Sequence, residues 1–246
     1  MPLPEVRIET DDTEATGYRR SLRLDEGVAS VAYRAGARAV HRECFASNPD
    51  EEIEWTWEVQ PPHPDPKPPN VLLLGDSISR NYYPEVTKDV AGVANVYLFA
   101  SSTSMGDPRL SHQIAEFKAM VNVRFRVVHF NNRMHGWSYT EAQYRAAFPE
   151  LLRRVRTLAG KDGALVWATI TPVKADAFNG ATNPRVEERN RIALDAIRAS
   201  GIPVDDQHTL MMQHLDLYED TVHFGSAGAT LMGDQAAETI RAALQK

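Results

Sequence analysis

A serine that directly follows an apolar run is the first residue of this sequence with a placement suited to chemistry. The run Val71–Leu74 leads into Gly75, Asp76 and Ser77, and α/β proteins bind ligands at the carboxyl ends of their parallel strands. Ser77 is therefore a candidate nucleophile. The tripeptide alone is more typical of a turn with a helix N-cap, and it is not the Gly-x-Ser-x-Gly elbow of the α/β-hydrolases.

A serine hydroxyl becomes a strong nucleophile when a histidine, itself oriented by an acceptor, takes its proton. His223 is the best candidate for that base, because Asp220 stands three residues before it and a helical pattern follows. This spacing lets Asp220 accept from Nδ1 and leaves Nε2 to face Ser77. His129 lies inside a predicted strand, where a hydrogen-bonded core histidine is expected.

These two segments together resemble the SGNH (GDSL-type) hydrolases. The resemblance rests on Gly-Asp-Ser after a strand and on Asp-x-x-His-Phe followed by glycine and a terminal helix, and it covers residues 71–246. It implies a flavodoxin-like α/β/α three-layer sandwich with a parallel sheet. It also implies hydrolysis or transfer of an acyl ester, with Ser77 as nucleophile, His223 as base and Asp220 as the residue that orients the base.

The resemblance further implies donors for the oxyanion that forms during acyl transfer. Family members present a glycine after the second strand, and Gly106 is the candidate here, although it can also serve only a turn. The Gly-x-Asn segment usual after the third strand lacks its glycine in this chain. We assign the donor role to Asn131, with Asn132 as the alternate, while two adjacent asparagines can instead satisfy turn backbone groups.

Polar and aromatic side chains after the nucleophile and after the third strand suit a sugar ring. Each of them can also be an ordinary loop or core residue. A branch of the superfamily that includes sugar O-acetyl esterases and O-acetyltransferases is similar in its Phe-Asn segment, so we expect an acetyl ester of a carbohydrate. The candidate substrate-binding residues are Arg80, Arg133, His135 and Trp137.

Alternative functions stay open at this point. The same triad also suits an O-acyltransferase, a thioesterase or a lysophospholipase-type lipase. A noncatalytic carbohydrate-binding domain would explain the incomplete third motif but not the presence of Ser77, Asp220 and His223 together. The sequence contains no phosphate-binding glycine loop, dinucleotide fingerprint or zinc-spaced cluster, so neither a cofactor nor a metal is expected.

Alternating strands and helices must position these residues. Short apolar runs typical of buried parallel strands alternate with helical apolar stripes, which predicts a parallel sheet covered on both faces. One helix is marked by a capping box at Thr140 and Gln143. We expect strands at 71–74, 96–100, 127–130 and 165–170, and helices at 140–158, 184–201 and 226–244.

Charge and proline content divide the 246 residues into unequal parts. Residues 1–60 contain 7 Lys and Arg against 13 Asp and Glu, so they carry the whole net charge of −6, because the remainder contains 20 of each sign. Six of the 15 prolines lie at 61–69, which predicts a stiff linker. We expect an acidic β-rich accessory segment at 1–60, with strands at 27–40 and 53–59, and a hydrolase domain at 70–246.

The same composition limits the partners. No basic face is present to bind nucleic acid or anionic lipid, and the single cysteine excludes an intrachain disulfide. The first residues lack a signal peptide, which predicts a cytoplasmic protein, or a secreted or periplasmic one if a signal has been removed. We expect a small-molecule or carbohydrate ester as substrate, neither nucleic acid nor membrane as partner, and leave assembly into a homo-oligomer open.

Overall fold

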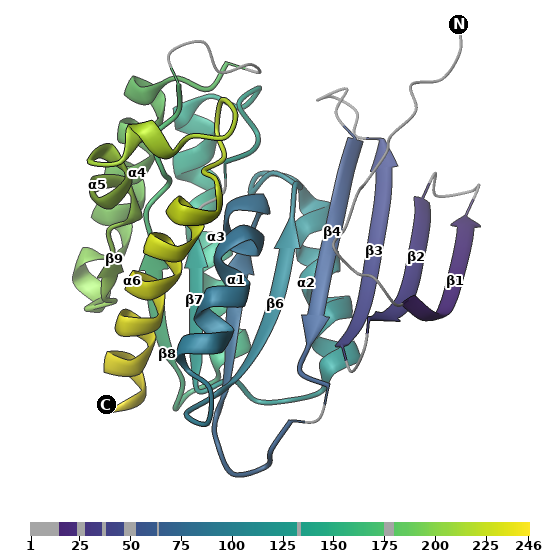
Figure 1. The fold of residues 1–246 in the computed structure, drawn as a ribbon. Coiled ribbons are helices and arrows are strands. Elements are labelled where there is room, and N and C mark those ends of the chain that lie inside the picture. The colour runs from purple at the N-terminus through teal and green to yellow at the C-terminus, as the bar shows by residue number, and fades with distance from the viewer. Residues whose placement is uncertain are drawn as a thin grey trace, which may run out of the picture.

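The computed structural model describes residues 15–23, 28–35, 38–46, 53–62, 64–131, 134–174 and 180–246. Within them, nine strands form one sheet in the order β1-β2-β3-β4-β6-β5-β7-β8-β9 (Figure 1). The strands are β1 Ala15–Arg23, β2 Val28–Ala35, β3 Arg38–Ala46, β4 Ile53–Gln60, β5 Asn70–Gly75, β6 Asn95–Ser101, β7 Val127–Asn131, β8 Ala164–Ala168 and β9 Val204–Asp205. The helices are α1 Ser77–Asp89, α2 Pro108–Val121, α3 Glu141–Ala159, α4 Asn183–Ile197, α5 Gln207–Met212 and α6 Ser226–Leu244, with short 3-10 turns at Arg198–Ser200 and Leu215–Leu217.

The five strands from β5 onward are parallel and have the flavodoxin-like order. Numbered from β5, their order in the sheet is 2-1-3-4-5, and the direction of winding reverses at β5 and β7, where such sheets bind ligands. All four predicted strands of this region are present, although β8 ends two residues before the predicted limit. The predicted flavodoxin-like α/β/α architecture is therefore confirmed.

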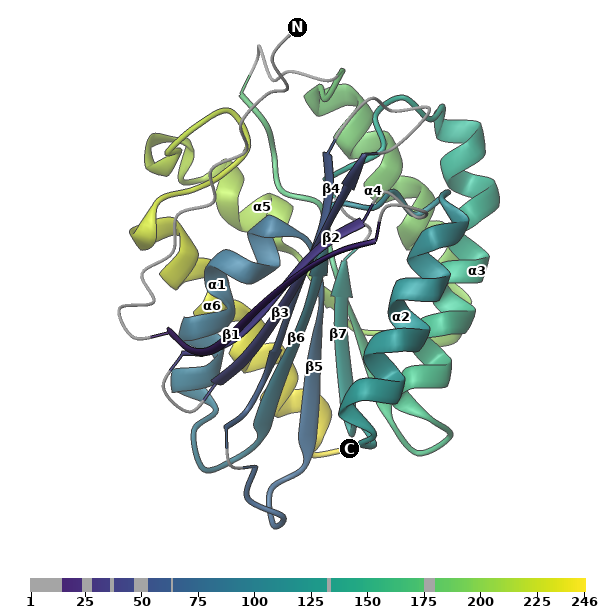
Figure 2. The same ribbon diagram turned by 90° about the vertical axis from the view of Figure 1, so that its right-hand side faces the viewer.

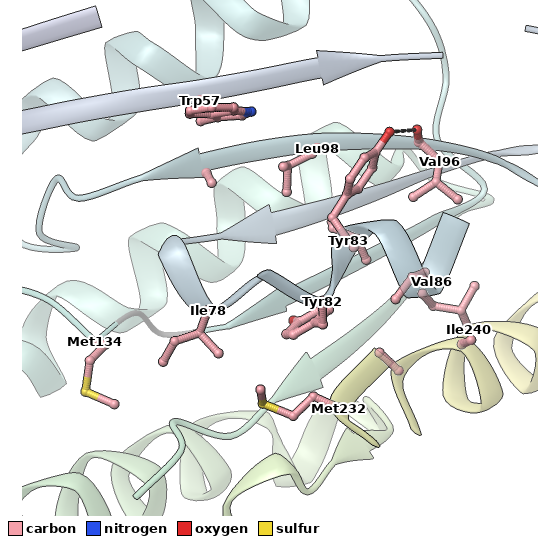
Figure 3. Packing of buried hydrophobic residues seen from close by; sticks show 14 of the residues in the cluster. Trp57, Ile78, Tyr82, Tyr83, Val86, Val96, Leu98, Met134, Met232 and Ile240 are labelled. Carbon is pink, nitrogen blue, oxygen red and sulfur yellow. Dashed lines mark hydrogen bonds between the residues drawn. The ribbon is translucent and has the colours of Figure 1, made fainter. Parts of the chain in front are cut away.

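Helices cover both faces of this parallel region. Figure 2 shows α1, α5 and α6 on one face and α2, α3 and α4 on the other. Every residue of β7 is buried, as the continuous apolar runs predict for strands covered on both sides. On the α1 face, Tyr83 packs against β6 and its hydroxyl donates to the Val96 carbonyl at 3.2 Å (Figure 3).

The three predicted helices form, although α4 ends at Ile197 and a 3-10 turn continues it to Ser200. Helices α1, α2 and α5 were not predicted. The capping box of Thr140 and Gln143 is present at the start of α3, and α6 has the predicted bounds. Helix α1 follows β5 without a loop and contains Pro84. The buried apolar residues of α2, Leu110, Ile114, Phe117 and Val121, have helical spacing, so α2 could have been predicted from the sequence. None of the helices in the described ranges is long and apolar enough to cross a membrane.

The N-terminal strands extend the same sheet instead of forming a second layer. Strands β1 to β4 form an antiparallel meander, and β4 pairs with β6. The prediction of one strand at 27–40 is wrong, because β2 and β3 lie there as an antiparallel pair with Ala35 opposite Arg38. Strand β1 was not predicted, since its side chains at 16–22 are exposed and give no apolar alternation.

A tryptophan joins this extension to the helix that follows β5. In the sheet, Trp57 lies opposite Ala100 of β6, which in turn lies opposite Gly75. The guanidinium carbons of Arg42 and Arg80 lie 3.5 and 3.7 Å from the Trp57 ring centroid. Two groups so close to one centroid must occupy opposite faces of the ring. Trp57 therefore connects β3 and β4 to α1 through two cation–π contacts.

We expect Trp57→Ala to lower the free energy of unfolding by about 3–5 kcal/mol, because it removes a buried indole and both contacts. Urea unfolding followed by circular dichroism measures this change. Tyr18→Ala is the control, since Tyr18 lies on β1 of the same extension but is 48% exposed, and surface substitutions usually cost less than about 1 kcal/mol. Equal losses in both variants would contradict a connecting role for Trp57.

Candidate active site

The structure brings the three residues of the predicted triad into one hydrogen-bonded line. Ser77 Oγ lies 2.6 Å from His223 Nε2, and His223 Nδ1 lies 2.7 Å from Asp220 Oδ2. With its Nδ1 proton donated to Asp220, the ring accepts the Ser77 hydroxyl proton at Nε2. This is the geometry that a serine nucleophile and its general base require.

The carboxylate of Asp220 is fixed from both sides. Its Oδ1 accepts hydrogen bonds of 2.7 Å from the backbone N–H groups of Val222 and His223, while Oδ2 accepts from the His223 ring. Partial burial raises the pKa of the Asp220 carboxyl, but these hydrogen bonds outweigh it, and the net pKa lies below its usual value. Asp220 therefore stays ionised near neutral pH and holds the ring in one tautomer.

A compact loop before α6 presents His223. Tyr218 and Phe224 form a β-bridge, and their rings stack with centroids 4.2 Å apart. The backbone N–H of Gly225 donates to the Leu217 carbonyl at 2.9 Å. These contacts close the loop at its base, so that the imidazole projects toward β5 from a fixed support.

Asp76 positions the nucleophile. Its Oδ1 accepts from the Ile78 backbone N–H at 3.0 Å, which makes Asp76 the N-cap of α1 and Ser77 the first helical residue. Its Oδ2 accepts from the Met134 backbone N–H at 2.7 Å. The buried carboxylate thus joins the start of α1 to the loop after β7.

The end of β5 is too crowded for any residue except glycine. A Cβ on Gly75 would lie 2.0 Å from Ser79 Oγ and 2.9 Å from Asn131 Nδ2. Asn131 Nδ2 donates to Ser79 Oγ at 2.9 Å, and Ser79 Oγ lies 3.1 Å from the Tyr82 hydroxyl. Asn131, our first oxyanion candidate, is therefore buried directly behind the nucleophile loop with part of its amide bonded to Ser79. The alternate Asn132 lies outside the described residues, as does Arg133.

Gly106 lies where the loop after β6 meets the loop after β7. Its backbone N–H reaches Ser104 Oγ at 3.4 Å, and a Cβ on Gly106 would lie 3.4 Å from the Tyr139 ring. Gly136 adopts φ +75°, and a Cβ there would lie 2.1 Å from Ser104 Oγ. The two loops that the family resemblance links to the oxyanion are therefore packed together, while the oxyanion role of Gly106 stays a prediction.

The predicted substrate-binding residues have different surroundings. Trp137 is buried, and its Nε1 donates to the Met134 carbonyl at 2.9 Å. The indole therefore packs beneath the loop after β7 and stabilises it. This position gives no support to the expected contact between Trp137 and substrate. Arg80 stacks on Trp57, as described above. His135 is partly exposed and makes an edge-to-face contact with Trp55, with centroids 6.2 Å apart.

Two arginines of α4, which sequence reasoning missed, hold the loop after β7. Arg189 donates to the carbonyls of His135 at 3.2 Å and Gly136 at 2.9 Å. Both Arg189 and Arg185 donate to the Tyr139 carbonyl at 2.9 Å. Burial lowers the pKa of Arg189 to about 10, so its charge persists at neutral pH. In the sequence, such arginines are indistinguishable from a solvated helix face, because their partners lie about 50 residues away.

A buried polar network supports the sheet near the site. His129 Nε2 lies 2.7 Å from Asp205 Oδ2, and Asp205 also accepts from Gln207 at 2.8 Å and Gln235 at 2.7 Å. His129 is thus the hydrogen-bonded core histidine that its place in a strand predicts. Among the described residues, the group whose ligand atoms could hold a metal contains no triad residue; it consists of Glu85, Asp89 and Asp234.

Comparisons with known proteins give one family model and a set of solved structures. Residues 1–64, about a quarter of the chain, match the family model for the N-terminal domain of glycosyl hydrolase family 65. No curated protein matches the sequence.

Solved structures match about seven tenths of the chain. A lipolytic protein of the G-D-S-L family from Veillonella parvula is 18% identical with a TM-score of 0.54, covering 70% of this chain and 98% of its own. A lipase/acylhydrolase from Enterococcus faecalis is 19% identical with a TM-score of 0.54, covering 71% and 96%. The catalytic domain of a peptidoglycan O-acetyltransferase from Streptococcus pneumoniae is 17% identical with a TM-score of 0.52, covering 73% and 96%. The chain therefore has the fold of the SGNH hydrolases.

Proposed function

We propose that this chain is a serine esterase that hydrolyses small acyl esters, with an acetyl ester of a carbohydrate as its substrate. The observation that carries the proposal is the line from Ser77 Oγ through His223 to Asp220, with contacts of 2.6 and 2.7 Å, at the switch point of the parallel sheet. Hydrolases and acylhydrolases among the structural neighbours support it.

In the first half of the reaction, Ser77 Oγ attacks the carbonyl carbon of the ester. His223 Nε2 takes the hydroxyl proton, and Asp220 stabilises the resulting imidazolium. The tetrahedral intermediate collapses when the alcohol oxygen leaves with the proton from His223. The acyl group then remains bound to Ser77 as an ester.

In the second half, water replaces the alcohol. His223 takes a proton from the water as it attacks the acyl carbon, and then returns that proton to Ser77 Oγ as the carboxylic acid leaves. Both tetrahedral intermediates carry an oxyanion. We propose that this oxyanion accepts hydrogen bonds from the backbone N–H groups of Ser77 and Gly106 and from the side-chain amide of Asn131 or Asn132. One such donor contributes about 3 kcal/mol of transition-state stabilisation.

The carbohydrate part of the proposal has two supports. One structural neighbour is the catalytic domain of a peptidoglycan O-acetyltransferase, an enzyme named for an acetylated glycan. The N-terminal residues match a domain of a glycosyl hydrolase family. The two comparisons are of different kinds, and both name proteins of carbohydrate chemistry.

The same transferase neighbour favours a second candidate function, that of an O-acetyltransferase. In that reaction a sugar hydroxyl takes the place of water in the second half, and the triad acts in the same way. Product analysis separates the two functions, because an esterase releases free acetate from an acetyl donor, whereas a transferase forms a new ester when an acceptor sugar is added.

We expect Ser77→Ala to lower kcat for acetyl ester hydrolysis by about a millionfold, because removal of a triad serine abolishes the covalent pathway. Acetate release at pH 7 measures this loss, and Ser200→Ala, at an exposed serine, is the matched control. Activity that survives in Ser77→Ala would refute the nucleophile. Absence of both hydrolysis and fluorophosphonate labelling in the wild type would instead favour a noncatalytic carbohydrate-binding domain.

We also expect the acyl group to be small, so kcat/KM should fall steadily from acetyl to butyryl to octanoyl esters of p-nitrophenol. Initial rates on this series measure the preference. A preference for octanoyl would exclude the acetyl assignment and favour a lipase.

For the oxyanion, we expect Asn131→Ala to lower kcat by about 10²–10³-fold and Asn131→Asp to lower it further. The alanine removes a donor, whereas the aspartate places a negative charge beside the forming oxyanion. Steady-state kinetics of both variants, with circular dichroism to verify folding, measure the difference. Wild-type activity in both variants would show that Asn131 is not an oxyanion donor and would transfer the role to Asn132.

A further inference from the structure

Strand β4 brings a second tryptophan to the end of the sheet where the parallel strands finish and the candidate active site lies. Trp57 is level with Gly75 in the sheet register, and Trp55 lies two residues farther toward the carboxyl ends of the parallel strands. The Trp55 backbone donates to Ser102 Oγ at 2.7 Å and accepts from the Ser102 N–H at 3.0 Å. Trp55 therefore lies at the same end of the sheet as Ser77, with β6 between the strand of Trp55 and the strand that precedes Ser77.

Trp55 also lies on the same face of the sheet as Ser77. Side chains two residues apart on a strand point to the same face, and the Trp57 ring contacts Arg80 of α1. Because α1 begins at Ser77, both tryptophans are on the face that carries the nucleophile. Trp55 packs at the margin of the core on this face and is only partly buried.

The loop after β7 completes the connection between Trp55 and the nucleophile. His135 meets the Trp55 ring at an interplanar angle of 84°. The preceding residue, Met134, is bonded through its backbone N–H to Asp76, the residue before Ser77. Arg189 fixes the His135 carbonyl. The two rings are thus held at the end of the sheet that carries the nucleophile, although Trp55 comes from the N-terminal extension.

We propose that Trp55 and His135 form a platform that binds the sugar ring of the acylated substrate. A pyranose has a flat face of C–H groups bordered by hydroxyls, and a partly exposed indole supplies a rigid apolar surface for that face. The imidazole of His135 meets the indole at its edge and holds it in place. The proposal rests on the proposed function, and it makes the N-terminal strands part of the substrate site.

The first test compares two acetyl esters with different alcohol groups. Glucose pentaacetate carries a sugar ring, whereas ethyl acetate carries none. We expect Trp55→Ala to lower kcat/KM for glucose pentaacetate about tenfold, mainly through KM, and to change that for ethyl acetate less than about twofold. Trp55→Phe should retain most of the activity on the sugar ester, and Tyr18→Ala on β1 is the control for general effects on the extension.

The outcomes separate the platform from a structural role. An equal loss on both esters in Trp55→Ala would mean that the residue only supports the fold, and this would overturn the proposal. Unchanged activity on glucose pentaacetate would overturn it as well. Selective loss on the sugar ester, with recovery in Trp55→Phe, would establish it.

A binding experiment separates failure of the platform from failure of the esterase. In ¹⁵N-labelled Ser77→Ala, the Trp55 indole resonance, assigned by its loss in Trp55→Phe, is followed while glucose pentaacetate or acetylated xylo-oligosaccharides are added. We expect this resonance to shift with at least one of the sugars. A shift without esterase activity in the wild type would leave the platform intact and refute the esterase. No shift with either sugar, in an active enzyme, would refute the platform alone.

Discussion

The buried carboxylate of Asp76 is the interaction on which the rest of the site depends. One of its oxygens caps α1, and the other binds the backbone of the loop after β7. The two elements come from β5 and β7, neighbours at the switch point of the sheet. Leaving either N–H group unpaired in the interior would cost about 1–3 kcal/mol. The position of Ser77 and the course of the neighbouring loop are therefore determined together.

Each side of the catalytic line is held by a different part of the fold. The loop before α6 supports His223 through Asp220 and the stacked pair of Tyr218 and Phe224. The opposite loop is held by Arg185 and Arg189 of α4, which bind its carbonyls. Because these supports exist before substrate binds, little reorganisation is needed during the reaction, and this is the condition under which fixed dipoles stabilise a transition state best.

The N-terminal strands share one sheet with the parallel region, despite their different charge and composition. Strand β4 pairs with β6 at the edge that would otherwise be open, and Trp57 joins the extension to α1. An unpaired edge strand is a site for aggregation, so the extension has a structural role in covering it. The same strand carries Trp55 to the catalytic edge, which connects that structural role with the substrate site that we propose.

The sequence by itself determined the features that depend on neighbouring residues. Continuous apolar runs located β5 to β8, the capping box located α3, and the three-residue spacing of Asp220 and His223 indicated their contact, because each signal lies within a few positions of chain. Tertiary structure alone decided the features that depend on distant pairing. The β4–β6 pairing placed Trp57 against Arg80 of α1. Arg189 binds carbonyls about 50 residues away, and the Asn131 amide donates to Ser79 from a strand 52 residues farther along the chain. Local pattern does not encode which strand edges and loops meet, because those contacts form only when the whole sheet assembles.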